Sequence, residues 1–422
     1  MSAKLKLIVM NFLQFAIWGA YLTSQGRYLG NIGLGEKIGI FYAMQGIVSI
    51  FMPAIIGIIA DKWIPAQKML GLCHIIAACT MIGAGYYGYI AGSDAQFSTL
   101  FTLYTISVAF FMPTIALSYS VAYTVLGKAG LDEIKAFPPI RIWGTIGFIC
   151  SMWFVDLMGF QTNSFQYITS GIIGLILAAY AFTLPNCDIK KSDKKQTLVE
   201  AMGLSAFKLF KQKKMAVFFI FSMLLGVALQ ITNGFANPFL GDFGNLPEYA
   251  NTFGVKHSNM LISLSQISET FCILLIPFCL HKFGIKKVML LAMIAWILRF
   301  GLFGLGNPGN GVWMFILSMI VYGIAFDFFN ISGSLFVNQN TDSSIRSSAQ
   351  GLFMLMTNGI GAALGTMTAQ LVVNHFVNSQ TNISNRMLGW SNAWYVFALY
   401  ALVVTIMFAI LFKYKHIPEK TK

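Results

Sequence analysis

Residues 312–337 read VWMFILSMIVYGIAFDFFNISGSLFV. At about 1.5 Å per residue, a helix of this length crosses the ~30 Å hydrocarbon layer of a membrane, so the stretch predicts a membrane-spanning helix. One acidic residue, Asp327, interrupts it, with Phe326 and Phe328 on either side. A charged group at this depth costs roughly 2.5–3.5 kcal/mol on insertion scales. We therefore expect Asp327 to have a function.

The whole chain shares this apolar character. Of its 422 residues, 57% are hydrophobic and 10% are charged, whereas soluble domains carry roughly 25% charged residues. Similar apolar runs recur throughout, which predicts an all-α membrane protein with twelve transmembrane helices. The first run is too long for a signal-peptide core, so we expect it to be retained. The expected spans are residues 7–29, 38–60, 69–91, 99–126, 137–159, 165–184, 215–240, 258–280, 288–306, 311–337, 347–374 and 391–413.

Positive residues are concentrated in alternate connections between these spans. When the even-numbered connections and both termini are assigned to the cytoplasm, 22 of the 28 Lys and Arg residues lie on that side and four lie outside. Cytoplasmic loops of membrane proteins carry such an excess, so we expect both termini to be cytoplasmic. The net charge of +13 follows these loops, and we expect no nucleic-acid binding.

A polar segment divides the twelve spans into six and six. We expect residues 1–184 to form an N-terminal six-helix bundle, 185–214 a charged cytoplasmic linker with an amphipathic helix, and 215–422 a C-terminal six-helix bundle. The halves echo each other weakly, since a cation-rich loop follows the second helix of each. The first of these loops, GIIADK at 57–62, resembles the G-x-x-x-D-K signature of the major facilitator superfamily of two-bundle transporters.

Two of the fifteen acidic residues lie deep in predicted spans, Glu269 in the eighth and Asp327 in the tenth. Amide, hydroxyl and aromatic groups accompany them. Gln266 precedes Glu269 by three residues and therefore shares its helix face. Pairs with similar helical spacing in other spans are Gln230 with Asn233, and Arg141 with Thr145.

These residues also have plainer interpretations. Ser, Thr and Asn in membrane helices often bond to a neighbouring helix. The phenylalanines around Asp327 can be core packing, and Arg299 in the ninth span can be a snorkelling or helix-bridging cation. A buried charge pair held only for packing would explain Glu269 and Asp327. The six cysteines contain no C-x-x-C pair and the five histidines no ligand spacing, so we expect no metal site.

The side chains in the spans suit an uncharged polyol with a flat ring. Carboxylate and amide oxygens accept from vicinal hydroxyls, amides and arginine read carbonyl and nitrogen edges, and a phenyl face stacks on a ring. A nucleoside meets every requirement, and a sugar meets all but the stacking. The sequence shows no nucleophile–base arrangement, phosphate loop or metal set, so we expect a transporter and not an enzyme. A polytopic sensor or scaffold is a further alternative, although the chain has no sizeable soluble output domain.

Several motifs resemble the bacterial nucleoside–proton symporters of the major facilitator superfamily. They are PPIRIWGTIGF at 138–148, LQITN at 229–233, SQISET at 265–270, AWILRF at 295–300 and FDFFNISGS at 326–334. The resemblance runs nearly end to end. It implies a central nucleoside site whose substrate-binding residues are Arg141, Thr145, Gln230, Asn233, Gln266, Glu269, Tyr322, Phe326 and Asp327.

The resemblance also implies proton-coupled uptake of nucleosides such as uridine and adenosine by alternating access. We expect Asp327 to carry the proton and Glu269 chiefly to bind the ribose, with the opposite assignment open. The chain departs from some family members at Ala228, where they have an acid. The expected setting is the bilayer of the bacterial cytoplasmic (inner) membrane, with a monomeric protein and no cofactor. The alternative is a proton-coupled sugar or oligosaccharide symporter of the same fold.

Overall fold

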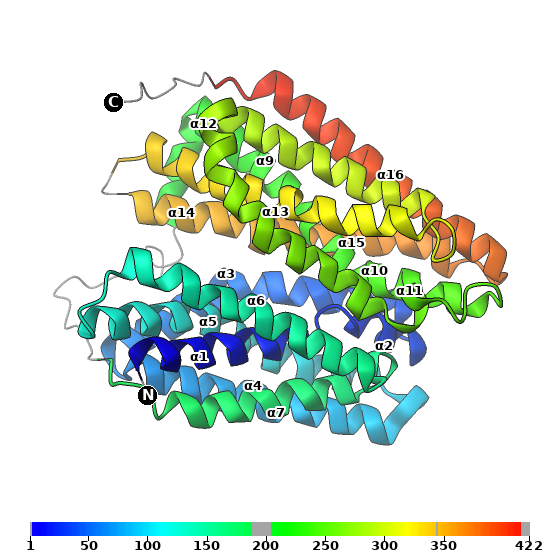
Figure 1. The fold of residues 1–422 in the computed structure, drawn as a ribbon, viewed down its shortest axis with the longest axis horizontal. Coiled ribbons are helices and arrows are strands. Elements are labelled where there is room, and N and C mark those ends of the chain that lie inside the picture. Colours follow the sequence, from blue (N-terminus) through cyan, green and yellow to red (C-terminus); the bar gives the residue numbers. More distant parts are fainter. Residues whose placement is uncertain (1, 188–203, 343–344, 415–422) are drawn as a thin grey trace. The chain divides into compact units, whose positions relative to one another are not determined.

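The computed structural model describes residues 2–187, 204–342 and 345–414, and all regular secondary structure within these ranges is helical (Figure 1). The chain divides into two compact units, Met1–Ala201 and Met202–Lys422. Residues 188–203, which hold most of the predicted linker, lie outside the described residues. So does the side chain of Asp61 in the predicted loop signature.

Seven α-helices are described in the N-terminal unit, and they overlap the six spans predicted there. Helix α1 packs on α6, and α4 packs on α5 and α7. The helices are α1 (Ala3–Gly19), α2 (Gln25–Asn31), α3 (Ile38–Lys62), α4 (Ala66–Ala91), α5 (Phe97–Lys128), α6 (Glu133–Leu157) and α7 (Phe165–Ala181). Short 3-10 segments are η1 (Gly35–Lys37), η2 (Gly92–Asp94) and η3 (Phe160–Thr162).

The first predicted span, 7–29, is not one continuous helix. Residues 20–24 form a turn between α1 and α2. The Tyr42 hydroxyl on α3 donates to the Leu22 carbonyl, and Ser24 Oγ donates to Gln166 Oε1 on α7 at 3.0 Å. Side chains from two other helices therefore fix this turn.

Helices α1 and α6 approach each other closely because glycine lies between them. A Cβ atom at Gly147 on α6 would lie 2.1 Å from the Phe12 carbonyl oxygen on α1. Only a residue without a side chain fits there. The same motif that contains Gly147 also carries Arg141, so this packing fixes the level of Arg141 relative to α1.

The C-terminal unit is built from longer and more interrupted helices. Helix α12 packs along α13 and α16, and α9 packs on the π-helix η6. The helices are α9 (Lys213–Leu229), α10 (Ile231–Asp242), α11 (Phe253–Lys256), α12 (Ser258–Leu305), α13 (Val312–Asn340), α14 (Arg346–Met354), α15 (Ala362–Val373) and α16 (Ile383–Leu411). The other segments are the 3-10 helices η4 (Leu204–Lys211) and η5 (Phe243–Asn245) and the π-helices η6 (Leu355–Gly361) and η7 (Asn374–Asn378).

Helix α12 contains two predicted spans, 258–280 and 288–306. They are separated at Gly284, where the backbone has φ 76° and ψ 166° within otherwise helical residues. Positive φ is accessible to glycine without a steric penalty from Cβ. The predicted connection is therefore reduced to a kink at one glycine.

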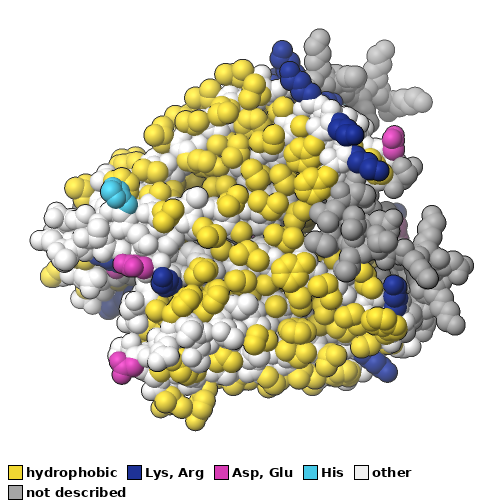
Figure 2. Space-filling model, turned by 180° about the vertical axis from the view of Figure 1, so that it is seen from behind, with side chains coloured by type: hydrophobic (Ala, Val, Ile, Leu, Met, Phe, Trp, Pro, Cys, Tyr) yellow, Lys and Arg dark blue, Asp and Glu magenta, His cyan; other side chains and the backbone are white. Residues whose placement is uncertain are grey.

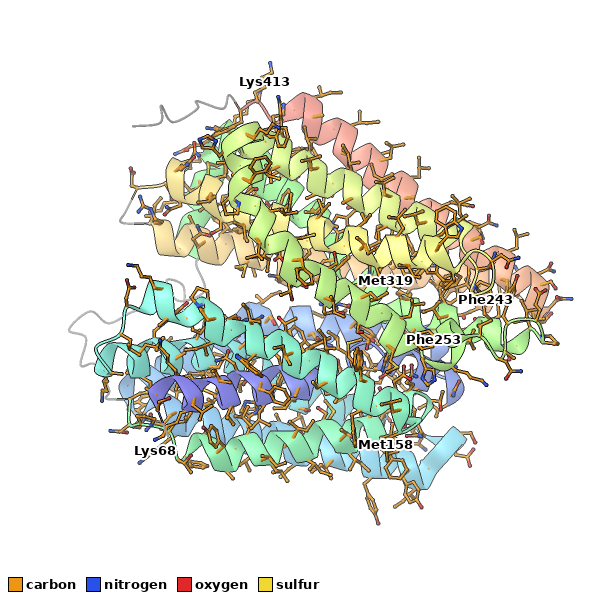
Figure 3. All side chains as sticks on the ribbon, in the orientation of Figure 1. Lys68, Met158, Phe243, Phe253, Met319 and Lys413 are labelled. Atoms are coloured by element: carbon orange, nitrogen blue, oxygen red, sulfur yellow. The ribbon has the colours of Figure 1, made fainter. Side chains whose placement is uncertain are left out.

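Nine helices in the described part of the chain are long and apolar enough to cross a membrane, and Phe165–Ala181 is a shorter apolar helix. Apolar side chains spread over the surface of these helices in Figure 2. Leu274 and Leu371, for example, are 74% and 69% exposed. Buried aromatic and aliphatic side chains fill each unit, among them Phe243 and Met319 (Figure 3). Exposed apolar belts over packed interiors are what a bilayer environment requires.

Candidate functional site

Arg141 and Thr145 lie one turn apart on α6 of the N-terminal unit. The Arg141 Nε donates to the Tyr119 hydroxyl at 2.9 Å, and its Cζ lies 3.9 Å from the centre of the Phe15 ring. Gly144 leaves the space that this arrangement needs, because a Cβ there would lie 2.6 Å from the Phe15 ring. The guanidinium is thus held on one face while it stays half-buried. Thr145 is also half-buried.

A second polar network in the N-terminal unit is satisfied internally. Gln14 Nε2 donates to Thr114 Oγ1 at 2.7 Å, and Gln14 Oε1 lies 2.8 Å from His74 Nε2. These three side chains are fully or almost fully buried. They therefore bridge α1, α4 and α5, and we assign them a structural role. The sequence pattern did not single out His74, because a lone histidine in an apolar helix carries no spacing signal.

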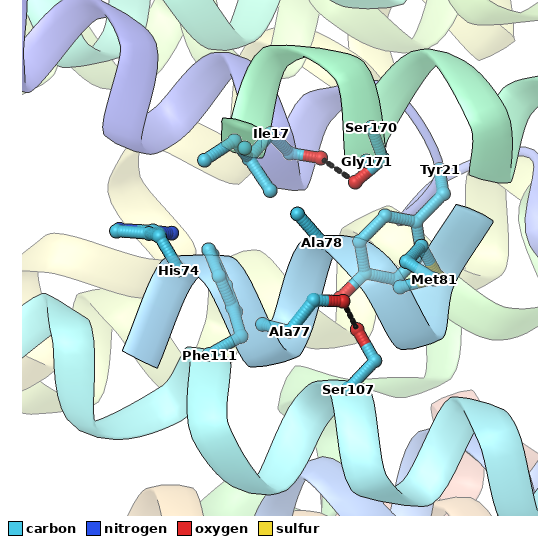
Figure 4. Close-up of a pocket in the computed structure, with 11 residues that line it drawn as sticks. Ile17, Tyr21, His74, Ala77, Ala78, Met81, Ser107, Phe111, Ser170 and Gly171 are labelled. Carbon is cyan, nitrogen blue, oxygen red and sulfur yellow. Dashed lines mark hydrogen bonds between the residues drawn. The ribbon is translucent and has the colours of Figure 1, made fainter. Parts of the chain in front are cut away.

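A small pocket lies beside this network (Figure 4). His74, Tyr21 and Phe111 line it, together with small residues of α4 and α7. The two serine hydroxyls at its wall are used by the backbone: Ser107 Oγ donates to the Ala77 carbonyl at 2.7 Å, and Ser170 Oγ donates to the Ile17 carbonyl at 2.8 Å. The wall offers few groups to a polar substrate.

In the C-terminal unit, two amides lie where the α9 and α10 helices meet. Gln230 separates the two helices, and Asn233 follows in the first turn of α10. The Asn233 amide donates to Gln230 Oε1 at 2.8 Å. Both side chains are half-buried, and the bond leaves the Gln230 nitrogen and the Asn233 oxygen without this partner. The i, i+3 spacing predicts this contact.

The two deep acidic residues lie on α12 and α13, which pack against each other. Tyr322 and Asp327 on α13 are 7% and 8% exposed, and Glu269 on α12 is half-buried. Tyr322 interacts electrostatically with both Glu269 and Asp327. Gln266, one turn before Glu269, has a buried Oε1 with no hydrogen-bond partner among the described residues. Amide, phenol and carboxylate groups therefore lie on two helices that pack against each other.

The phenylalanines around Asp327 have different roles. Phe328 and Phe329 are buried in the apolar core of the unit. Phe326 is half-buried, and its ring is parallel to that of Tyr322, with 6.0 Å between ring centres and 5° between planes. Phe326 also lines a pocket whose other walls are Leu225, Gly226, Leu229, Trp296, Ala325, Asn330 and Thr357. The packing interpretation is thus right for Phe328 and Phe329, while Phe326 offers a ring face to a pocket.

Comparison with known proteins identifies the group to which this arrangement belongs. A family model described as nucleoside H⁺ symporter matches residues 1–417. The chain belongs to the nucleoside H⁺ symporter family. It is 49% identical to the xanthosine permease of Escherichia coli K12, over 100% of this chain and 99% of that protein. It is 44% identical to the nucleoside permease NupG of the same strain, over 100% and 98% of the two chains.

Solved structures agree with this assignment. A crystal structure of a NupG mutant superposes with a TM-score of 0.92 and 44% identity, covering 98% of this chain and 100% of that one. A D-xylose–proton symporter matches with a TM-score of 0.71 at 13% identity, over 97% of each chain. The fold of this family member is therefore the all-helical transporter fold of the major facilitator type. Its relatives are permeases, so this family member is a membrane transporter and not an enzyme.

Proposed function

We propose that this chain takes up nucleosides together with protons by alternating access. The observation that carries the proposal is the placement of Glu269 and Asp327, which both interact electrostatically with the buried Tyr322, in a member of the nucleoside H⁺ symporter family. Ionisable groups inside a membrane domain are costly and mark ion or proton pathways. Two of them beside aromatic and amide groups suit a substrate and a proton bound together.

The C-terminal unit supplies most of the proposed substrate contacts. Glu269 accepts from the ribose hydroxyls, because carboxylate oxygens are strong acceptors for vicinal diols. Phe326 stacks on the base, with Tyr322 parallel to it. The amides of Gln230, Asn233 and Gln266 both donate and accept, which suits the mixed donor and acceptor edge of a nucleobase.

The N-terminal unit contributes Arg141 and Thr145. The Arg141 guanidinium has a fixed orientation, set by the Tyr119 hydroxyl and the Phe15 ring. A planar guanidinium presents several donors in a rigid fork and suits recognition of carbonyl oxygens. The Thr145 hydroxyl adds a donor and an acceptor one turn away.

Asp327 is the proposed proton carrier. Its side chain is more deeply buried than that of Glu269, and moving a charged carboxylate through an apolar interior costs several kcal/mol. If the site is alternately exposed to water and closed to it, the neutral form of the carboxyl is favoured when water is excluded. The carboxyl therefore takes up a proton before the site closes. Glu269 is proposed to act chiefly on the substrate.

The remaining features of the proposal concern topology and partners. We expect twelve transmembrane helices with both termini in the cytoplasm, organised as residues 1–184, a cytoplasmic linker 185–214 and residues 215–422. We expect the protein to reside as a monomer in the cytoplasmic (inner) membrane. The proton gradient drives it, without a cofactor. The proposed substrates include uridine and adenosine.

Uptake by purified protein in liposomes tests this function. With an acidic exterior, labelled uridine is expected to accumulate above its external concentration, and a protonophore is expected to abolish the accumulation. Excess adenosine is expected to compete, whereas excess free pentose is not. Failure to accumulate any nucleoside would overturn the proposal. Competition by pentose alone would instead identify a sugar symporter.

A further inference from the structure

A buried cation, Arg299, packs against the proposed substrate residue Tyr322. Arg299 on the second half of α12 is 2% exposed, inside a segment that is apolar enough to span a membrane. Its Nη1 donates to the Ser318 carbonyl at 2.8 Å and to Ser265 Oγ at 3.3 Å. Both acceptors are neutral. Burying a charge costs free energy unless neighbouring groups compensate it. The groups that pack on this guanidinium therefore indicate its role.

The guanidinium lies on the ring of Tyr322. Its Cζ is 4.5 Å from the centre of that ring, within the range of a cation–π contact. Trp296, one turn before Arg299, meets the same ring edge-on at 5.9 Å and 89°. Phe326 lies parallel to it at 6.0 Å. Arg299, Trp296 and Phe326 therefore fix the plane of the Tyr322 ring.

The hydrogen bonds of Arg299 also fix the level of two helix segments. Ser265 is four residues before Glu269, and Ser318 is four residues before Tyr322, so each lies one turn from a proposed substrate residue. Ser318 Oγ returns a hydrogen bond to the Arg299 carbonyl at 2.9 Å. One side chain thus ties the Glu269 segment of α12 to α13 beside Tyr322.

We propose that Arg299 is a positioning residue of the transport site, which holds the Tyr322 ring and the register of Glu269 against it without contacting the nucleoside. This role rests on the proposed function. It needs a planar group that stacks and donates in the same plane, as a guanidinium does. A lysine ammonium keeps the charge but has no plane to stack on the Tyr322 ring.

The test measures uridine uptake in proteoliposomes for variants of Arg299 and of its hydrogen-bond partner Ser265. Arg299→Lys is expected to raise the KM for uridine tenfold or more, with the number of protons per uridine unchanged. Ser265→Ala removes one acceptor and keeps the charge, so it is expected to raise the KM about threefold in the same direction. Leu298→Ala is the matched control: this side chain is next to Arg299 on α12 but is 50% exposed, it is not a proposed substrate contact, and the KM is expected to stay unchanged.

A double-mutant cycle separates positioning from a general loss of structure. In a Tyr322→Ala background, Arg299→Lys is expected to raise the KM by a smaller factor than in the wild type, because the ring that Arg299 positions is gone and only its bonds to Ser265 and Ser318 remain. An unchanged KM in Arg299→Lys, or the same increase in both backgrounds, would overturn the role of Arg299. Wild-type protein without protonophore-sensitive nucleoside uptake would overturn the proposed function itself, and the role with it.

Discussion

The side-chain amide of Asn233 donates to the side-chain oxygen of Gln230 at 2.8 Å, so these two proposed substrate contacts orient each other. The bond determines which atoms remain for a nucleoside: the Gln230 nitrogen as a donor and the Asn233 oxygen as an acceptor. Both lie where α9 gives way to α10. The hydrogen-bond partners of an amide side chain determine which way its oxygen and nitrogen point. This bond between Gln230 and Asn233 therefore fixes which atom each amide offers to a substrate.

We predict that Gln230→Ala and Asn233→Ala each raise the KM for uridine about tenfold, which corresponds to about 1.4 kcal/mol. Each single substitution also frees the other amide to rotate, so the double variant should show less than the product of the two effects. Initial rates of labelled uridine uptake measure this. Asn245→Ala, in η5 beyond α10, serves as the control with wild-type KM. Fully multiplicative effects would contradict mutual orientation.

The two deep carboxylates should differ in what they control. Asp327→Asn keeps the size and polarity of the side chain but cannot release a proton, so uphill accumulation of uridine should vanish while exchange of internal for external uridine persists. Glu269→Gln should instead raise the KM roughly tenfold and keep some accumulation, because one ribose acceptor is weakened. Accumulation and exchange assays on the same vesicles distinguish the two. Asp94→Asn, in η2 between α4 and α5, is the control.

Full proton-driven accumulation by Asp327→Asn would remove Asp327 from the proton pathway. Loss of accumulation in Glu269→Gln with an unchanged KM would reverse the two assignments.

The orientation of Arg141 should matter as much as its charge. Arg141→Lys should raise the KM for uridine more than tenfold. A lysine ammonium has no planar group that can stack on the Phe15 ring while it donates a hydrogen bond to the Tyr119 hydroxyl. Tyr119→Phe removes only the 2.9 Å hydrogen bond, so a smaller increase of about threefold is expected. Tyr86→Phe, on an exposed part of α4, is the control. Equal KM values for Arg141→Lys and the wild type would show that charge alone suffices.

Local sequence patterns predict much of this structure. Apolar runs locate the helices, and the i, i+3 and i, i+4 spacings place Gln230 with Asn233 and Arg141 with Thr145 on common faces. Glu269 and Asp327 are conspicuous because the bilayer makes buried acids costly. The grouping of these residues into one functional class depended on longer motifs that resemble a family.

Other features depend on residues far apart in the chain and leave no local pattern. The turn at residues 20–24 is fixed by Tyr42 and Gln166, neither of which is adjacent in sequence. Arg299 has a snorkelling interpretation in sequence, but its cation–π contact comes from Tyr322 on another helix. The sequence predicts a loop between residues 280 and 288. No local pattern indicates that the chain turns there at a single residue, Gly284, within one helix.

That glycine provides a stability prediction. Gly284→Ala places a Cβ on a residue with φ 76° and ψ 166°, a backbone conformation that is nearly restricted to glycine and costs another residue about 1–3 kcal/mol. The midpoint of thermal unfolding of the purified protein should fall. Gly301→Ala is a matched control on the same helix, where a Cβ meets no atom within 4 Å and alanine is the better helix former by about 1 kcal/mol. A midpoint lower for Gly301→Ala than for Gly284→Ala would contradict the argument.

Asp242 at the end of α10 joins that helix to α16. Its Oδ2 accepts from Arg386 Nε and from Trp390 Nε1, each at 2.7 Å. Asp242→Ala should destabilise the C-terminal unit by about 1–2 kcal/mol, at the lower end for bonds to a charged group because the pair is partly exposed. Thermal unfolding should detect this, while the KM for uridine stays at the wild-type value. Glu36→Ala, in η1 of the other unit, is the control. A raised KM without lost stability would instead place Asp242 in transport.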